Sequence, residues 1–195
     1  MSRQAVQAVE LTDRRKQILQ AAIEIIATEG YSALGMRSLA RASGLKLGAL
    51  QYHFANWEAL LVALASYISD VYKAGWHDLQ ARGVGSSPVE FIQMLLEDAP
   101  GNALLSDRLW PQLWAMGQVE PLVKELVDGI YAQYLSLLER ALKTAGSPAP
   151  RIEAIALMSL VEGSTIFIGE GRRWEKHRKQ VEKFVLDAIR ERSGA

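Results

Sequence analysis

The chain has 195 residues, of which 49% are hydrophobic and 23% charged, with 22 basic side chains, 22 acidic side chains and no cysteine. This composition is typical of a globular protein with one large or two small domains, and it excludes a disulfide scaffold and thiolate chemistry. We expect a cytoplasmic protein with no signal peptide and no membrane span.

Helical hydrophobic periodicity recurs along the chain after residues 1–11, which we expect to form a flexible arm. The first predicted helix starts after Thr12 or Asp13 and ends at Gly30. The next three cover Met36–Ala42, Leu47–His53 and the stretch from Asn56 past Asp78. Further helices are predicted over Val89–Glu97, Leu104–Met116, Gln118–Ala145 (with Pro121 as an alternative start), Ile152–Ile168 and Trp174–Arg190. No alternating pattern long enough for a strand interrupts them, so the predicted fold is all-α with about nine helices.

The stretch Met36–Phe54 has the pattern of two short helices joined by a tight turn. Gly44 can take a positive φ, which such a turn requires. Leu50 and Phe54 then fall on one face of the second helix, four residues apart. This is the helix-turn-helix pattern, whose second helix enters the major groove of DNA.

The charge distribution agrees with that interpretation. Residues 1–54 contain seven Lys or Arg and four Asp or Glu, which gives a net charge of +3. The remainder has fifteen against eighteen, a net charge of −3, so any attraction for phosphates is confined to the N-terminal part.

The same region resembles the TetR family of bacterial transcriptional regulators over about residues 12–65. The matching residues are Ile18, Leu19, Ala21, Ala22, Gly30, Leu39, Ala40, Gly44, Leu45, Gly48, Leu50, Tyr52, His53, Phe54, Asn56, Glu58 and Leu60. The resemblance implies a three-helix DNA-binding domain over 12–72, joined by a long fourth helix to a ligand-binding and dimerisation domain over 73–195. It further implies a homodimer on a roughly palindromic operator, released by a small molecule, with no cofactor.

Four positions depart from the family's usual residues. The family usually has Thr at Gly35, a small polar residue at Lys46, an aromatic at Gln51, and Lys or Arg at Trp57. We therefore expect the fold of this stretch to follow the family, and its base preference and phosphate contacts to differ.

The outward side of the second short helix supplies most of the predicted DNA contacts. Gln51 can pair with adenine, Leu47 and Ala49 can contact a thymine methyl, and Lys46, Tyr52 and His53 suit phosphates. Arg37 matches a DNA-contact position of the family. The predicted set is Arg37, Lys46, Leu47, Gly48, Ala49, Gln51, Tyr52 and His53.

Aromatic and methionine side chains in the second part of the chain indicate a pocket for an apolar or amphipathic effector, cationic if indoles stack on it. The candidates are His77, Phe91, Met94, Trp110, Trp114, Met116, Tyr134 and Phe167, with Gln93, Gln112, Gln118 and Glu162 as polar groups that could orient the ligand. The alternative for each apolar residue is a plain helical core.

The last two predicted helices have matching apolar stripes that could form a four-helix dimer interface. The predicted interface residues are Ile155, Ser159, Gly163, Ile166, Val181, Phe184, Val185 and Ala188, and the alternative is packing within one subunit. A basic run between the helices, from Arg172 to Lys179, is interpreted as a solvated helix face.

Enzymatic functions find no support in the sequence. The three histidines lie far apart, which excludes ligand spacing for a metal, and no residues group as a catalytic triad or a phosphate-binding loop. The sequence therefore predicts a ligand-responsive transcriptional repressor. The alternative is a helical small-molecule-binding or scaffold protein that has lost operator binding, which Gly35 and Trp57 keep open.

Overall fold

The computed structural model of the chain describes residues 12–81, 87–96 and 108–193, without the side chains of residues 75–80 and 192–193. In chain order its elements are α1 (Asp13–Glu29), the 3₁₀ turn η1 (Tyr31–Ala33), α2 (Met36–Ala42), α3 (Leu47–His53), α4 (Trp57–Ala81), α5 (Pro88–Leu96), α6 (Leu109–Gly117), α7 (Pro121–Thr144), α8 (Pro150–Ile168), the 3₁₀ turn η3 (Glu175–His177) and α9 (Arg178–Ser193). No strand occurs in these ranges, and the all-α prediction is confirmed.

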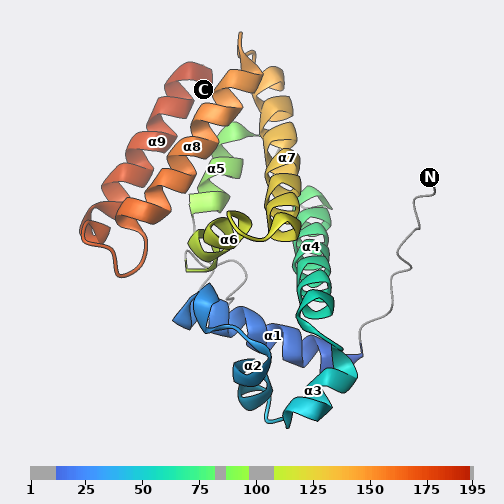
Figure 1. Cartoon of the computed structure of the whole chain (residues 1–195). Helices are drawn as coiled ribbons and strands as arrows, with labels where there is room; N and C mark the ends of the chain where they lie inside the picture. Colours follow the sequence, from blue (N-terminus) through green and yellow to red (C-terminus); the bar gives the residue numbers. More distant parts are fainter. Residues whose placement is uncertain (1–11, 82–86, 97–107, 194–195) are drawn as a thin grey trace, which may run out of the picture.

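The helices form two groups joined by α4 (Figure 1). The first group, α1 to α3, lies at one end of the molecule, and α4 rises from it to pack against α7. The second group contains α5 to α9, in which α7 packs against both α6 and α8. Residues 82–86 and 97–107, the latter including the predicted start of the sixth helix, fall outside the described residues.

Local signals set the helix ends at the N-terminal side. The Thr12 hydroxyl accepts a hydrogen bond from the N–H of Arg15 (3.4 Å), and α1 ends at Gly30, which has φ +89°. The Asn56 side chain accepts one from the N–H of Ala59 (2.8 Å) and so caps α4. Each of these is a standard capping interaction that satisfies a backbone group left free at a helix end.

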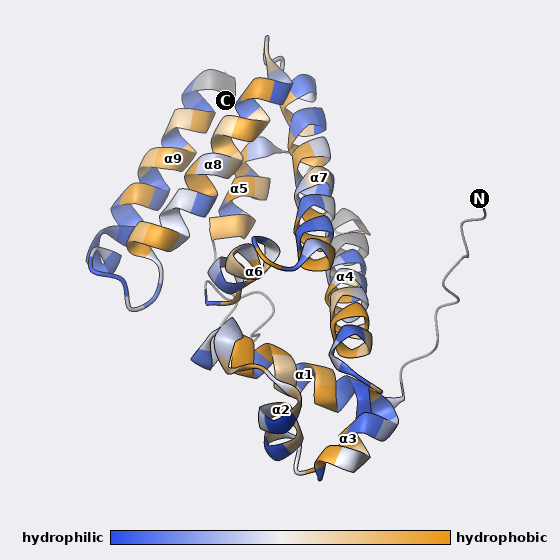
Figure 2. Cartoon of the chain, in the orientation of Figure 1, coloured by the Kyte–Doolittle hydropathy of each residue, from blue (hydrophilic) through white to orange (hydrophobic). Residues whose placement is uncertain are grey.

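Two hydrophobic cores hold the molecule together, and Figure 2 shows the apolar sides of the helices that form them. The first core contains residues of α1 to α4 together with α6 and the first half of α7. The second contains residues of α5, the second half of α7, α8 and α9. The first core therefore continues past residue 72, where the sequence predicts a domain boundary, because α6 and α7 contribute side chains to it.

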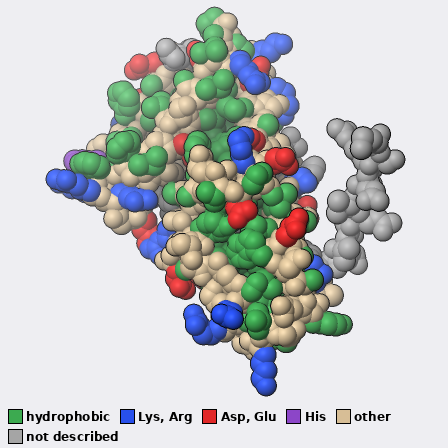
Figure 3. All heavy atoms as spheres, in the orientation of Figure 1, with side chains coloured by type: hydrophobic (Ala, Val, Ile, Leu, Met, Phe, Trp, Pro, Cys, Tyr) green, Lys and Arg blue, Asp and Glu red, His purple; other side chains and the backbone are tan. Residues whose placement is uncertain are grey.

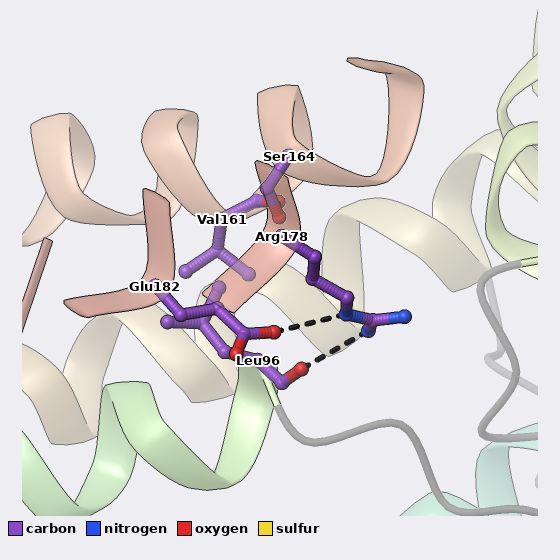
Figure 4. A network of polar contacts seen from close by, with 5 residues as sticks. All are labelled: Leu96, Val161, Ser164, Arg178 and Glu182. Carbon is purple, nitrogen blue, oxygen red and sulfur yellow. Dashed lines mark hydrogen bonds and ion pairs between the residues drawn. The ribbon is translucent and has the colours of Figure 1, made fainter. Parts of the chain in front are cut away.

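The last helix begins later than predicted. Instead of Trp174, it starts at Arg178, after a turn in which the N–H of Gly171 (φ +74°) donates to the carboxylate of Glu175 (2.8 Å). The Arg178 guanidinium donates to Glu182 (2.9 Å) and to the carbonyl of Leu96 at the end of α5 (3.2 Å), as Figure 4 shows. The contact between Arg178 and Leu96 joins segments 82 residues apart in the sequence, and local periodicity cannot reveal it.

Candidate nucleic-acid interface and ligand pocket

The turn between α2 and α3 has the hydrogen bonds of a Schellman motif. The N–H of Leu45 donates to the carbonyl of Ala40 (2.8 Å), and the N–H of Gly44 donates to that of Arg41 (3.1 Å). Such a motif places its central residue in the left-handed region. Gly44 has φ +66°, in agreement with the role the sequence predicts for it. The turn thereby sets the angle between the two short helices.

Apolar packing fixes one side of α3 and leaves the other free. Leu50 and Phe54 are 0% and 1% exposed and share a core with Ile18 of α1 and Leu39 of α2. The guanidinium carbon of Arg15 lies 4.6 Å from the centre of the Phe54 ring, which is a cation–π contact. With these residues held inward, the opposite side of α3 faces solvent.

Most of the predicted DNA-contact residues lie on that solvent side or beside it. Arg37, Lys46, Gly48, Ala49, Gln51 and Tyr52 are exposed, and Leu47 and His53 are half-buried. Tyr52 is 87% exposed and contacts the His53 ring edge to face, at 5.5 Å between ring centres. Lys and Arg side chains stand at the end of the molecule where α2 and α3 lie (Figures 1 and 3). The arrangement presents one convex, basic helical surface of a size that fits a major groove.

The structure gives physical reasons for two of the unusual residues. Gly35 precedes α2 without a capping side chain, and the Ser38 hydroxyl accepts a hydrogen bond from the N–H of Gly35 (2.9 Å) instead. Trp57 is half-buried and packs on the first core, with its ring 6.4 Å from that of Tyr31. Trp57 therefore has a packing role where the family usually has a cation.

A pocket of about 580 Å³ lies between α6, α7 and α8. Its volume is in the range of cavities that bind small molecules. It is lined by Pro111, Trp114, Tyr131, Leu135, Ile155, Met158, Ser159, Glu162, Gly163, Thr165 and Ile166. The lining is mostly apolar, with a few polar groups that could orient a ligand.

A chain of hydrogen bonds crosses the pocket wall. The indole N–H of Trp114 donates to the Tyr131 hydroxyl (2.9 Å), which in turn donates to the carboxylate of Glu162. Burial, the negative charge of Glu162 and this hydrogen bond raise the pKa of Tyr131. Burial and then the charge of Glu162 also raise the pKa of Tyr134 to about 12. Both tyrosines therefore keep their protons at neutral pH, mainly because they are buried.

Of the eight residues predicted to bind a ligand, Trp114 lines this pocket. Phe91 and Met116 are 1% and 0% exposed and belong to the two cores instead, which corrects their predicted role. Met94, Trp110 and Tyr134 are half-buried and pack on the cores, Phe167 points outward with 55% of its surface exposed, and the side chain of His77 lies outside the described residues.

Tyr131 lines the pocket although it is not in the predicted ligand-binding set, and four other lining residues are predicted at a different site. Ile155, Ser159, Gly163 and Ile166 are predicted at a dimer interface, and here they face the pocket. The signal that could have identified Tyr131 is its position four residues before Leu135 and three before Tyr134, on the α7 side that faces α6 and α8.

α8 and α9 also expose apolar residues that do not line the pocket, and we call these residues the outer apolar surface. It comprises Ile152 (68% exposed), Leu160 (53%), Phe167 (55%), Val181 (36%) and Phe184 (72%). Figure 3 shows hydrophobic side chains on the surface of this part of the molecule. The predicted interface residues Val181, Phe184 and Ala188 are exposed there, whereas Val185 is 4% exposed and packs within the second core, which corrects its assignment.

α6 links the pocket to the N-terminal helices. On one side it carries the lining residues Pro111 and Trp114. On the other, the side-chain oxygen of Gln112 accepts a hydrogen bond from the N–H of Tyr31 (3.3 Å). The Tyr31 hydroxyl donates to the carboxylate of Glu120, three residues after α6 ends. A displacement of α6 at the pocket would therefore change its contact with η1, which connects α1 to α2.

Two further properties concern the described part of the chain alone. None of its helices is long and apolar enough to cross a membrane. Within the same residues, no group of three or more His, Cys, Asp and Glu side chains is placed to hold a metal ion.

Comparison with known proteins identifies the region that carries the helix-turn-helix. Residues 18–64 match the family model described as bacterial regulatory proteins, tetR family. The HTH-type transcriptional regulator PksA of Bacillus subtilis is 32% identical over 90 residues, which are 46% of this chain and 43% of that protein. The chain thus matches less than half the length of this curated relative.

Solved structures match over most of the chain. A TetR-family transcriptional regulator from Rhodococcus sp. is 25% identical, with a TM-score of 0.72 over 93% of this chain and 100% of that chain. AibR in complex with isovaleryl coenzyme A and operator DNA has the same fold at 19% identity, with a TM-score of 0.65 over 90% of this chain and 97% of that one. The helix-turn-helix region of the chain therefore matches the TetR family of bacterial regulatory proteins, and the whole chain has the fold of a TetR-family DNA-binding transcriptional regulator.

Proposed function

We propose that this regulator is a homodimeric repressor, which leaves its operator when a small apolar or amphipathic molecule fills the pocket between α6, α7 and α8. The observation that carries the proposal is the position of α6. The same nine-residue helix lines the pocket through Pro111 and Trp114 and contacts the DNA-binding helices through Gln112.

DNA recognition is assigned to the free side of α3. Gln51 can form two hydrogen bonds to an adenine edge, and the side chains of Lys46, Tyr52 and His53 are of types that contact phosphates. Arg37 adds a cation from α2. The structure of AibR with operator DNA supports this use of the fold.

Dimerisation is assigned to the outer apolar surface. Side chains such as Ile152 and Phe184 expose most of their surface to solvent, and a second copy would cover them by a two-fold contact. The two recognition helices of a dimer must then be about 34–36 Å apart to reach successive half-sites. A change in that separation is the means by which a ligand could release DNA.

Release requires the ligand to bind the two spacings of the recognition helices with different affinity. We propose that a molecule in the pocket displaces α6 and, through the Tyr31–Gln112 and Tyr31–Glu120 contacts, shifts η1 and α1. α4 carries the same displacement along its packing against α7. A coupling free energy of about 1–3 kcal/mol would change operator affinity by about 5- to 150-fold.

The test is selection of bound fragments from genomic DNA by the purified full chain, followed by footprinting of the enriched sequence. We expect a palindromic footprint with half-sites one helical turn apart, and lower transcription from the adjoining promoter in vitro when the protein is added. Higher transcription would contradict the repressor assignment. Failure to enrich any DNA even at low salt would favour the other class, a helical binding protein without an operator. Trp57 is consistent with that class, because it packs on the first core where the family usually has a cation.

A further inference from the structure

We propose that the second copy of the chain completes the ligand pocket, because it covers the open side of the pocket along α8. This inference rests on the proposed function, since it concerns the same pocket and the same homodimer. It goes further because it makes the effector site a shared site, which exists in full only when two subunits are together.

The first argument is that the pocket has an exposed apolar rim. Ile166 is 59% exposed, Trp114 is 51% exposed and Ile155 is 44% exposed, although all three line the pocket. Small-molecule sites ordinarily bury about 70–90% of the surface of their ligand. An apolar effector in this pocket would keep one side in water unless a further surface covers the rim.

The second argument is the uncharged exposed face of α8. The side chains that α8 exposes between positions 152 and 167 are all uncharged, and their spacing of three and four residues places them on one side of the helix. They are Ile152, Ile155, Ala156, Ser159, Leu160, Ile166 and Phe167.

This face joins the rim to the outer apolar surface. Ile155 and Ile166 belong to the rim, whereas Ile152, Leu160 and Phe167 belong to the outer apolar surface and lie within one helical turn of rim residues. A second copy that covers the outer apolar surface therefore reaches the rim as well. Two copies of this uncharged face can meet about a two-fold axis without placing like charges opposite each other, which makes a second copy the fitting partner.

The third argument is Gly163, which lines the pocket near the middle of that face. Glycine is less favourable than alanine inside a helix. The rest of the subunit does not require a glycine here, since Gly163 has no positive φ and a Cβ built at this position meets nothing within 4 Å. Close approach of a second backbone accounts for the missing side chain.

A single engineered thiol tests whether the rim is covered, because the chain has no cysteine. Ser159→Cys places the thiol at an exposed lining position, and the control Ser136→Cys places it at an exposed position of α7 outside the lining. We expect N-ethylmaleimide to modify Ser159→Cys on the order of tenfold more slowly than Ser136→Cys in the dimeric full chain. Equal rates in a dimer overturn the proposal.

The neutral apolar dye N-phenyl-1-naphthylamine tests whether the cover completes a binding site, by fluorescence titration without DNA. We expect monomeric Phe184→Glu protein to bind the dye on the order of tenfold more weakly than the wild-type dimer, since about 50–60 Å² of the dye would stay in water. The control Val119→Glu, at an exposed residue outside the lining, should bind it like wild type. Equal or tighter binding by the monomer, no binding by the wild-type dimer, or a Phe184→Glu protein that stays dimeric overturns the proposal.

Gly163→Leu and Gly129→Leu separate contact with the second copy from a role in the pocket alone. Both glycines lie inside helices, and a Cβ built at either meets nothing within 4 Å, so neither change creates a clash there within the subunit. Gly163→Leu should raise the dimer dissociation constant on the order of tenfold in sedimentation equilibrium, because it overpacks the contact, and Gly129→Leu should leave it unchanged. An unchanged constant in Gly163→Leu contradicts the proposal.

The outcome is separable from that of the proposed function. A dimer that binds its operator but leaves Ser159→Cys as reactive as Ser136→Cys refutes the shared site and retains the repressor. A protein with a protected Ser159→Cys thiol and no operator does the reverse. A monomeric wild-type chain would refute both, and sedimentation equilibrium identifies that case directly.

Discussion

Gly44 and Gly48 allow the tight turn to be tested by the same substitution at two sites. Gly44 lies at the turn between α2 and α3 with φ +66°, and Gly48 lies within α3. A Cβ built at either position has nothing within 4 Å, so neither Gly44→Ala nor Gly48→Ala creates a clash. The backbone conformation alone then decides the sign of the effect.

The magnitudes follow from that conformation. Alanine in the left-handed region costs about 1–2 kcal/mol, so Gly44→Ala should lower the free energy of unfolding by about 1 kcal/mol after the reduced entropy of the unfolded chain is included. In a helix, alanine is better than glycine by about 0.8 kcal/mol, so Gly48→Ala should raise the free energy of unfolding by that amount. Each change corresponds to a shift of about 2–4 °C in Tm.

Urea denaturation followed by circular dichroism measures both variants under the same conditions. The expected result is a difference in free energy of unfolding of about 2 kcal/mol between the two variants, with wild type between them. A Gly44→Ala protein as stable as wild type, or more stable, would refute the argument that the turn needs a left-handed residue. In that case the Schellman hydrogen bonds of Leu45 and Gly44 would not explain why glycine stands there.

Three further predictions concern DNA, assembly and pH. Gln51→Ala should cost about 1–3 kcal/mol on the selected operator and little on random DNA in a gel-shift titration, and equal losses on both would exclude base recognition by Gln51. Phe184→Glu should shift the protein from dimer to monomer in sedimentation equilibrium. The control Val119→Glu, at a 66% exposed residue between α6 and α7, should leave the dimer intact. A dimeric Phe184→Glu protein would mean that the interface lies elsewhere. Burial and then Glu120 raise the pKa of Tyr31 from an ordinary value of 10.0 to about 12. The neutral phenol therefore stabilises the fold fully below about pH 10, and this stabilisation is lost as the pH rises to about 12. Tyr31→Phe should cost about 1 kcal/mol at neutral pH, a figure reduced for solvent screening, and the difference from wild type in urea denaturation should shrink above about pH 10; a constant difference would contradict it.

Local chemistry explains why the N-terminal helices could be predicted well from the sequence. The bounds of α2 and α3 agree with the prediction because Gly44 and the apolar pair Leu50 and Phe54 act within a few residues of one another. The cap at Asn56 is likewise a contact over three residues. Signals of this kind can be recognised from the sequence, because the residues that carry them lie within a few positions of the helix ends that they determine.

The pocket depends on contacts that no local pattern contains. The sequence pattern correctly predicts that Phe91 and Val185 lie on apolar helix faces. Periodicity does not show which helix each face contacts, and both residues pack in the second core. The pairing of Tyr131 with Trp114 and Glu162 joins three helices. α8 adds a further ambiguity, because some of its exposed apolar residues line the pocket and others do not, and the sequence pattern does not distinguish them.

The position of α6 has a consequence for protein engineering. Leu135, Ile155 and Met158 line the pocket from α7 and α8, away from the helix whose Gln112 contacts Tyr31. A biosensor for a new inducer can therefore be built by exchanging side chains on that wall. The α6 wall, with Pro111 and Trp114, should be kept, since changes there alter the transmission of the signal together with ligand choice.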